Sequence, residues 1–91
     1  MGHQSSETLE QLVKASQSQV QIGQMYRHYK DPSKTYRIIA IALDEASESV
    51  SIVYQALYHP HLTWIRPINN FLETVSWEGK TAQRFQPIST P

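Results

Sequence analysis

A basic and aromatic run, YRHYK at residues 26–30, is the part of the sequence whose residue types best suit ligand chemistry. Alternate side chains of an extended strand point to opposite faces, so Tyr26, His28 and Lys30 share one face. Residues 25–37 hold four basic side chains against one acidic side chain. Cations that meet phosphates, beside rings that stack on bases, are typical of sites for single-stranded nucleic acid or a nucleotide.

The same run also has a purely structural interpretation. In so small a domain Tyr26 and Tyr29 are needed to fill the core, and long basic side chains often cover apolar surface with their stems. Core packing with solvated charge is the favoured interpretation for most of the run. A binding role is kept for part of it.

A second candidate is the corner WIRP at residues 64–67. Trp64 and Arg66 share a face if this piece is extended, so the guanidinium can stack on the indole or hold an anion. It can equally brace the corner by bonding to loop carbonyls, which is slightly favoured. Arg84 has the same two interpretations, and Phe85 is predicted to be core. The predicted ligand-binding surface joins Tyr26, His28, Lys30, Tyr54, Trp64 and Arg66.

Metal and catalytic sites have little support. His59 and His61 flank a proline, but a metal site needs a third and fourth ligand, and no cysteine or carboxylate cluster is near. No Ser, Cys or paired carboxylate stands out as a partner that would make His28 a general base. We therefore predict no metal, no cofactor and no catalytic residues, and a protein that is more plausibly a binding module than an enzyme.

Length and composition narrow the class further. Ninety-one residues suffice for one small domain, and eight basic against eight acidic residues give zero net charge. An anionic partner must then be held by a local patch rather than by the overall field of the protein. The absence of cysteine excludes disulfides and favours a cytoplasmic location. The longest apolar run, 38–43, is too short to cross a membrane, so no membrane partner is expected.

The composition divides the chain into an N-terminal extension, residues 1–20, and a β-rich domain, residues 21–91. The extension is predicted to hold one short helix over Glu7–Ser16, capped by Ser5 or Ser6. Its apolar residues recur at the i, i+3, i+4 spacing of an amphipathic helix: Leu9, Leu12 and Val13.

The remainder is predicted to be mainly β, because apolar residues alternate and turn residues cut the chain into short pieces. Strands are expected at Met25–Lys30, Thr35–Leu43, Ser51–Tyr58, Thr63–Arg66, Glu73–Trp77 and Thr81–Gln86, with one helical turn at Ile68–Leu72. Glu78-Gly79 suits a tight hairpin, since glycine supplies a positive φ. Five or six short strands with one N-terminal helix favour a small SH3-like, partly closed barrel. An open α+β sheet is the alternative.

Four motifs occur in order along the chain: GQMYRHYK at 23–30, VYQALY at 53–58, WIRP at 64–67 followed by Phe71, and the pair Arg84-Phe85. Together they resemble DUF family 1653, a bacterial family catalogued as a domain of unknown function, over roughly Gly23 to Ile88. The resemblance implies a compact β-rich domain of bacterial origin with no established activity. It does not cover the N-terminal helix.

Two functions of different classes are therefore expected. The first is a non-enzymatic module that binds a nucleotide, a single-stranded nucleic acid or another anionic ligand through the basic and aromatic surface. The second is a protein interaction or self-association module that uses a strand edge or the N-terminal helix.

Overall fold

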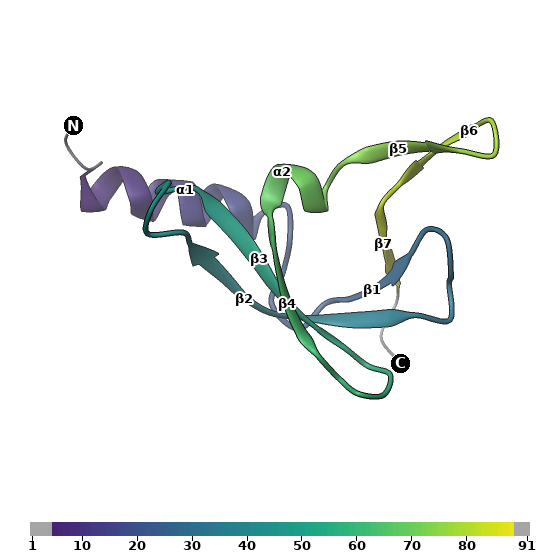
Figure 1. Cartoon of the computed structure of the whole chain (residues 1–91). Coiled ribbons are helices and arrows are strands. Elements are labelled where there is room, and N and C mark those ends of the chain that lie inside the picture. The colour runs from purple at the N-terminus through teal and green to yellow at the C-terminus, as the bar shows by residue number, and fades with distance from the viewer. Residues whose placement is uncertain (1–4, 89–91) are drawn as a thin grey trace.

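The computed structural model describes residues 5–88, so the outer ends of the two predicted segments, 1–4 and 89–91, lie outside it. Within the described residues, two helices and seven strands follow one another along the chain. They are α1 (Ser6–Gln17), β1 (Met25–His28), β2 (Thr35–Leu43), β3 (Val50–Ala56), β4 (Thr63–Pro67), α2 (Ile68–Phe71), β5 (Thr74–Trp77), β6 (Lys80–Gln83) and β7 (Phe85–Ile88) (Figure 1).

Five strands form one antiparallel sheet in the order β4-β3-β2-β1-β7, and β5 pairs with β6 in a separate two-stranded ribbon. The register between β2 and β3 shifts between Ile38 and Ala40, and such a bulge bends the strand and increases its twist. The sheet curls into a half-barrel, with α2 and the β5–β6 ribbon on one side of it (Figure 1). The predicted class, a mainly β, partly closed fold with a short N-terminal helix, is confirmed.

Helix α1 is one residue longer at each end than predicted. Ser5 is its N-cap, as one of the two expected serines, and its Oγ accepts a hydrogen bond from the Thr8 backbone N–H at 3.2 Å. The helix packs against β2 and β3, and Ser16 near its end is buried. Val20, just beyond it, is completely buried in the core of the sheet. Within residues 5–88, neither helix is long and apolar enough to cross a membrane.

Only Thr35–Leu43 keeps the predicted strand bounds: β3, β4 and β5 differ from their predictions by one or two residues at one or both ends, and two further predicted strands differ for reasons that the backbone shows. β1 ends at His28 rather than at Lys30, because the Lys30 backbone N–H turns back to donate to His28 Nδ1 at 3.2 Å. The predicted last strand, 81–86, is two strands that meet at Arg84. There the backbone N–H donates to the Glu73 carbonyl at 2.9 Å, while the Arg84 carbonyl accepts from the Tyr29 N–H at 3.1 Å. After Arg84 the chain leaves the β5–β6 ribbon, and β7 pairs with β1.

The turn between β5 and β6 is the predicted tight hairpin. Glu78 and Gly79 both have positive φ, at 52° and 76°, which is the backbone of a two-residue primed turn. Pairing continues directly on either side of it, from Trp77 opposite Lys80. The expected turn chemistry at Gly79 is confirmed.

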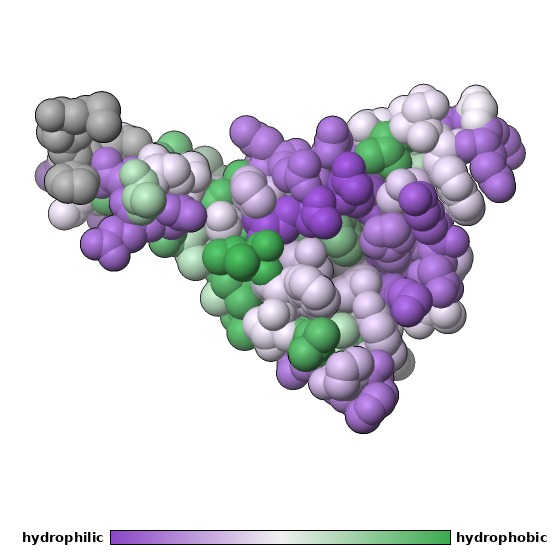
Figure 2. Space-filling view, viewed as in Figure 1, coloured by the Kyte–Doolittle hydropathy of each residue, from purple (hydrophilic) through white to green (hydrophobic). Residues whose placement is uncertain are grey.

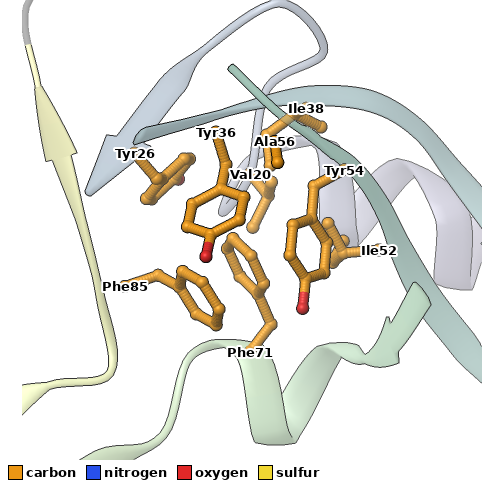
Figure 3. Close-up of a cluster of buried hydrophobic side chains, with 9 residues drawn as sticks. All are labelled: Val20, Tyr26, Tyr36, Ile38, Ile52, Tyr54, Ala56, Phe71 and Phe85. Carbon is orange, nitrogen blue, oxygen red and sulfur yellow. The ribbon is translucent and has the colours of Figure 1, made fainter. Parts of the chain in front are cut away.

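The core fills the concave side of the curled sheet and is unusually aromatic (Figure 3). Its buried members are Val20, Tyr26, Tyr36, Ile38, Ile52, Tyr54, Ala56, Phe71 and Phe85. Those from β3 lie at alternate positions, as the sequence pattern predicts for one face of a strand. Phe71 comes from α2, which packs across β3 and β4, so this short helix covers the core.

Candidate functional site

A hollow of about 190 Å³ opens beside the aromatic core. Most of its wall is made of rings, from Tyr36, Tyr54, Tyr58, Trp64 and Phe85. Two basic side chains complete it: His28 from the end of β1 and Arg66 from β4. In this hollow, aromatic faces, hydroxyls and basic groups lie side by side.

The hollow brings together four of the six predicted ligand-binding residues: His28, Tyr54, Trp64 and Arg66. β1 and β4 are not neighbours, because β2 and β3 lie between them in the sheet. His28 and Arg66 reach one hollow only because the sheet curls. Trp64 stands at its rim with 49% of its surface exposed.

Tyr26 and Lys30 do not line this hollow. Tyr26 is in the core, where its ring meets that of Phe71 edge-on at 5.1 Å, and burial raises the pKa of its hydroxyl. Lys30 is exposed beyond the end of β1, with Nζ 5.7 Å from the centre of the Tyr29 ring. The structural interpretation of the basic run therefore fits Tyr26, whereas His28 from the same run reaches the hollow.

Three lining residues were not in the predicted surface: Tyr36, Tyr58 and Phe85. The alternation in residues 50–58 puts Tyr58 on the same face as Tyr54, which is a signal that could have added it. Phe85 was predicted to be core and is buried, and its ring also forms part of the wall. The Tyr36 and Tyr58 hydroxyls are hydrogen-bonded at 2.7 Å.

A chain of hydrogen bonds holds Arg66 in place. Its Nη1 donates to Asn70 Oδ1, and its Nε donates to the Tyr54 hydroxyl at 3.4 Å. Asn70 Nδ2 donates in turn to Glu73 Oε2 at 3.2 Å, and Arg84 Nη2 forms an ion pair with the same oxygen at 2.8 Å. Arg66 therefore braces this corner, as was slightly favoured, but through side chains rather than the loop carbonyls that were expected.

Positive charge surrounds the hollow. The Arg66 guanidinium lies over the Phe85 ring at 5.7 Å, and Lys34 Nζ lies over the Tyr58 ring at 4.6 Å. Burial, with the nearby charges of Arg84, Lys30 and Arg66, lowers the pKa of His28, and Asp31 opposes this effect. Burial and these charges favour the neutral imidazole of His28.

The histidines at the turn between β3 and β4 are placed away from the hollow. His59 and His61 are both exposed, and neither lines it. Residues 5–88 contain no group of three or more His, Asp or Glu side chains that could hold a metal ion.

Fold and hollow together define a small mainly β domain with a half-barrel sheet and a basic, aromatic concavity. The family described as "Protein of unknown function (DUF1653)" matches residues 24–87, and the chain belongs to this family. The chain is also similar to the crystal structure of a DUF1653 protein from Bordetella bronchiseptica, with 27% sequence identity and a TM-score of 0.68 over 81% of this chain and 96% of that chain. A comparison with curated proteins gave no match.

Proposed function

We propose that this domain is a non-enzymatic binding module that takes an anionic ligand into the hollow, with a nucleotide or single-stranded nucleic acid as the leading candidates. The observation that carries the proposal is the convergence of Arg66 and His28 with Trp64 and three tyrosines on one concave surface. A bacterial, cytoplasmic protein is the setting we propose, supported by the cysteine-free sequence and by the motifs it shares with the family.

The charges around the hollow support an anionic rather than a cationic ligand. Aromatic walls alone would also suit a methylated ammonium group, which binds to ring faces. Here no carboxylate is among the lining residues, and basic side chains lie over two of the rings, those of Tyr58 and Phe85. A surplus of positive charge of this kind supports an anionic ligand, so we favour phosphate-bearing ligands.

Fluorescence of Trp64 gives a direct test. In a Trp77→Phe background the remaining tryptophan reports on the rim of the hollow, and it is titrated with AMP and with a short single-stranded oligothymidine. We expect a saturable change that weakens as salt is raised, because phosphate contacts are screened. Absence of any response to either probe, together with a response to a trimethyllysine peptide, would falsify the proposal.

A matched pair of variants separates the hollow from general charge. Arg66→Gln removes a guanidinium from the hollow, whereas Arg27→Gln removes one from β1, where the exposed Arg27 side chain bonds to Gln86. Both variants lose one positive charge. We expect Arg66→Gln alone to abolish most of the response, with circular dichroism confirming that both remain folded.

A second function, protein interaction or self-association, is favoured by one observation. β4 is the edge of the five-stranded sheet, and Ile65 on it is 62% exposed. Figure 2 shows apolar surface over the region where β3 and β4 run, in contrast to the polar surface around α2. An unpaired, apolar edge can add a strand from another chain.

Sedimentation at increasing concentration tests this second function. An Ile65→Lys variant blocks the edge, and deletion of residues 1–15 removes most of α1 while keeping Ser16 and Val20, which are buried. Loss of association in the Ile65→Lys variant identifies the β4 edge as the interface, and loss in the deletion variant identifies α1. A monomer at all concentrations in the unaltered protein, with no retained partner chain, would rule this function out.

A further inference from the structure

His28, which lines the hollow, has one hydrogen-bond donor that the described chain does not use. Its Nδ1 accepts the Lys30 backbone N–H at 3.2 Å, and a neutral imidazole has one accepting and one donating nitrogen. The proton of the neutral ring is therefore on Nε2. Within residues 5–88, Nε2–H has no hydrogen-bond acceptor. The ring is thus oriented by its backbone contact, and its remaining N–H is available to a ligand.

The tyrosines add two further donors. The Tyr36 and Tyr58 hydroxyls are 2.7 Å apart, and only one of them can donate to the other, so one O–H is left over. The Tyr54 hydroxyl accepts from Arg66 and donates to no other group in the described chain. Figure 3 shows the Tyr36 and Tyr54 rings side by side with their oxygens at the same end. The hollow is therefore rich in donors.

The cations beside the hollow exceed the anions that neutralise them. Arg66 and Arg84 depend on one carboxylate, Glu73, which Arg66 reaches only through Asn70. Arg84 Nε is buried and has no partner among the described residues. A ligand group with several accepting oxygens and more than one negative charge would bond to these donors and neutralise the excess positive charge.

The size of the hollow limits how much of a ligand it can take. Sites that enclose a whole small molecule usually measure roughly 300–1,000 Å³, and this one measures about 190 Å³. It therefore holds one group of a larger molecule. Trp64, half exposed at the rim, offers a ring face to the part that stays outside.

Building on the proposed function, we propose that the hollow binds a terminal phosphate monoester, at the end of a nucleotide or nucleic acid strand, while the adjoining base stacks on Trp64. A terminal phosphate carries a charge of about −1.5 to −2 and three accepting oxygens. An internal phosphodiester has one charge and two such oxygens. The monoester is the better match to donors from His28, Tyr54, Arg66 and the Tyr36–Tyr58 pair.

The test compares one short oligothymidine strand with a 5′-phosphate and with a 5′-hydroxyl, by calorimetry at a single salt concentration. AMP and inorganic phosphate are titrated alongside to separate a nucleotide from a free phosphate. We expect the 5′-phosphate to tighten binding at least about tenfold, since charge-assisted hydrogen bonds are strong. We expect AMP to bind and inorganic phosphate to bind far more weakly, because the latter has no base for Trp64.

Tyr54→Phe should remove most of the advantage of the 5′-phosphate, which is measured as a smaller ratio between the affinities for the 5′-phosphorylated and 5′-hydroxyl strands. Tyr58→Phe serves as a second hollow variant, and Tyr26→Phe removes a core hydroxyl as the control. Equal affinity for the two strands would contradict the proposed preference for a phosphate monoester. It would not contradict the proposed binding of an anionic ligand. Tighter binding of a phosphoserine peptide than of the 5′-phosphorylated strand would also overturn it. If neither strand, AMP nor phosphate binds, the proposed function fails as well.

Discussion

The rings of Phe71 and Phe85 are stacked, with centroids 4.5 Å apart and planes within 6° of parallel. Phe71 comes from α2 and Phe85 begins β7, so this one contact joins the short helix to the last strand. Phe85 also forms part of the wall of the hollow, and Phe71 supports it from the core side. The stack therefore links the stability of the fold to the shape of the candidate site.

Phe71→Ala should lower the free energy of unfolding by about 3–5 kcal/mol, because it leaves a cavity where a fully buried ring was. In a domain of this size such a loss is close to the whole stability. Leu72→Ala, at the neighbouring half-exposed position, is the control and should cost less than about 1 kcal/mol. Urea denaturation followed by circular dichroism measures both. A small effect of Phe71→Ala would mean that α2 does not hold the core together.

Acid should destabilise the domain through His28. Its pKa in the folded chain is lowered, chiefly by burial and then by Arg84, Lys30 and Arg66, and the effect is only partly offset by Asp31. The unfolded chain then binds the proton more readily than the folded chain does. The free energy of unfolding should therefore fall as the pH drops below about 6.5, the ordinary pKa of histidine.

Urea denaturation at pH 7.5 and pH 5 measures this effect, with the His28→Asn variant as the comparison. Asparagine keeps an acceptor near the position of Nδ1 but has no group that titrates. The variant should lose less stability than the unaltered protein over this pH range. Equal losses in the two proteins would remove His28 as the cause.

Tyr36 should ionise only at a high pH, together with unfolding of the domain. Burial, followed by the hydrogen bond between the Tyr36 and Tyr58 hydroxyls and by the groups nearby, raises the pKa of Tyr36 well above its usual range. Above about pH 10 the unfolded chain gives up this proton while the folded chain keeps it, so stability falls as the pH rises.

An alkaline titration followed by phenolate absorbance and by circular dichroism checks whether ionisation of Tyr36 coincides with unfolding. The signal of Tyr36 should appear only together with cooperative unfolding, and Tyr36→Phe should delete that late step. Ionisation of Tyr36 before any loss of the circular dichroism signal is the result that contradicts this prediction.

Arg84 should matter for ligand binding although it does not line the hollow. Its ion pair at 2.8 Å occupies Glu73, which otherwise becomes a free carboxylate next to Asn70 and Arg66. Arg84→Ala should weaken binding of the 5′-phosphorylated strand about tenfold, since it removes a charge and releases a competing anion. Its cost in stability should be near 1 kcal/mol, because the pair is partly exposed.

Lys80→Ala is the control for Arg84→Ala. It removes an equal charge from the exposed β5–β6 ribbon and should leave binding nearly unchanged. Calorimetry on both variants separates a specific effect of the ion pair from a general loss of positive charge. Equal weakening in the two variants would show that only the total charge counts.

Much of the secondary structure follows from local patterns. β2 has the predicted bounds, α1 begins beside an expected serine cap, and the Glu78-Gly79 turn has the predicted positive φ. These features depend on side chains within a few residues of one another, which a sequence displays directly. The strands of the final segment were predicted less well, because the break at Arg84 depends on backbone partners at Glu73 and Tyr29.

The sequence by itself determined which residue types this protein has for binding: basic and aromatic side chains in the runs 26–30 and 64–67. Only the tertiary structure decided that His28 and Arg66 share a hollow, that Tyr26 is in the core, and that Lys30 is outside. The physical reason is that the curl of the sheet arises from the bulge in β2, the pairing register and the packing of Phe71, all of which join residues far apart in the chain.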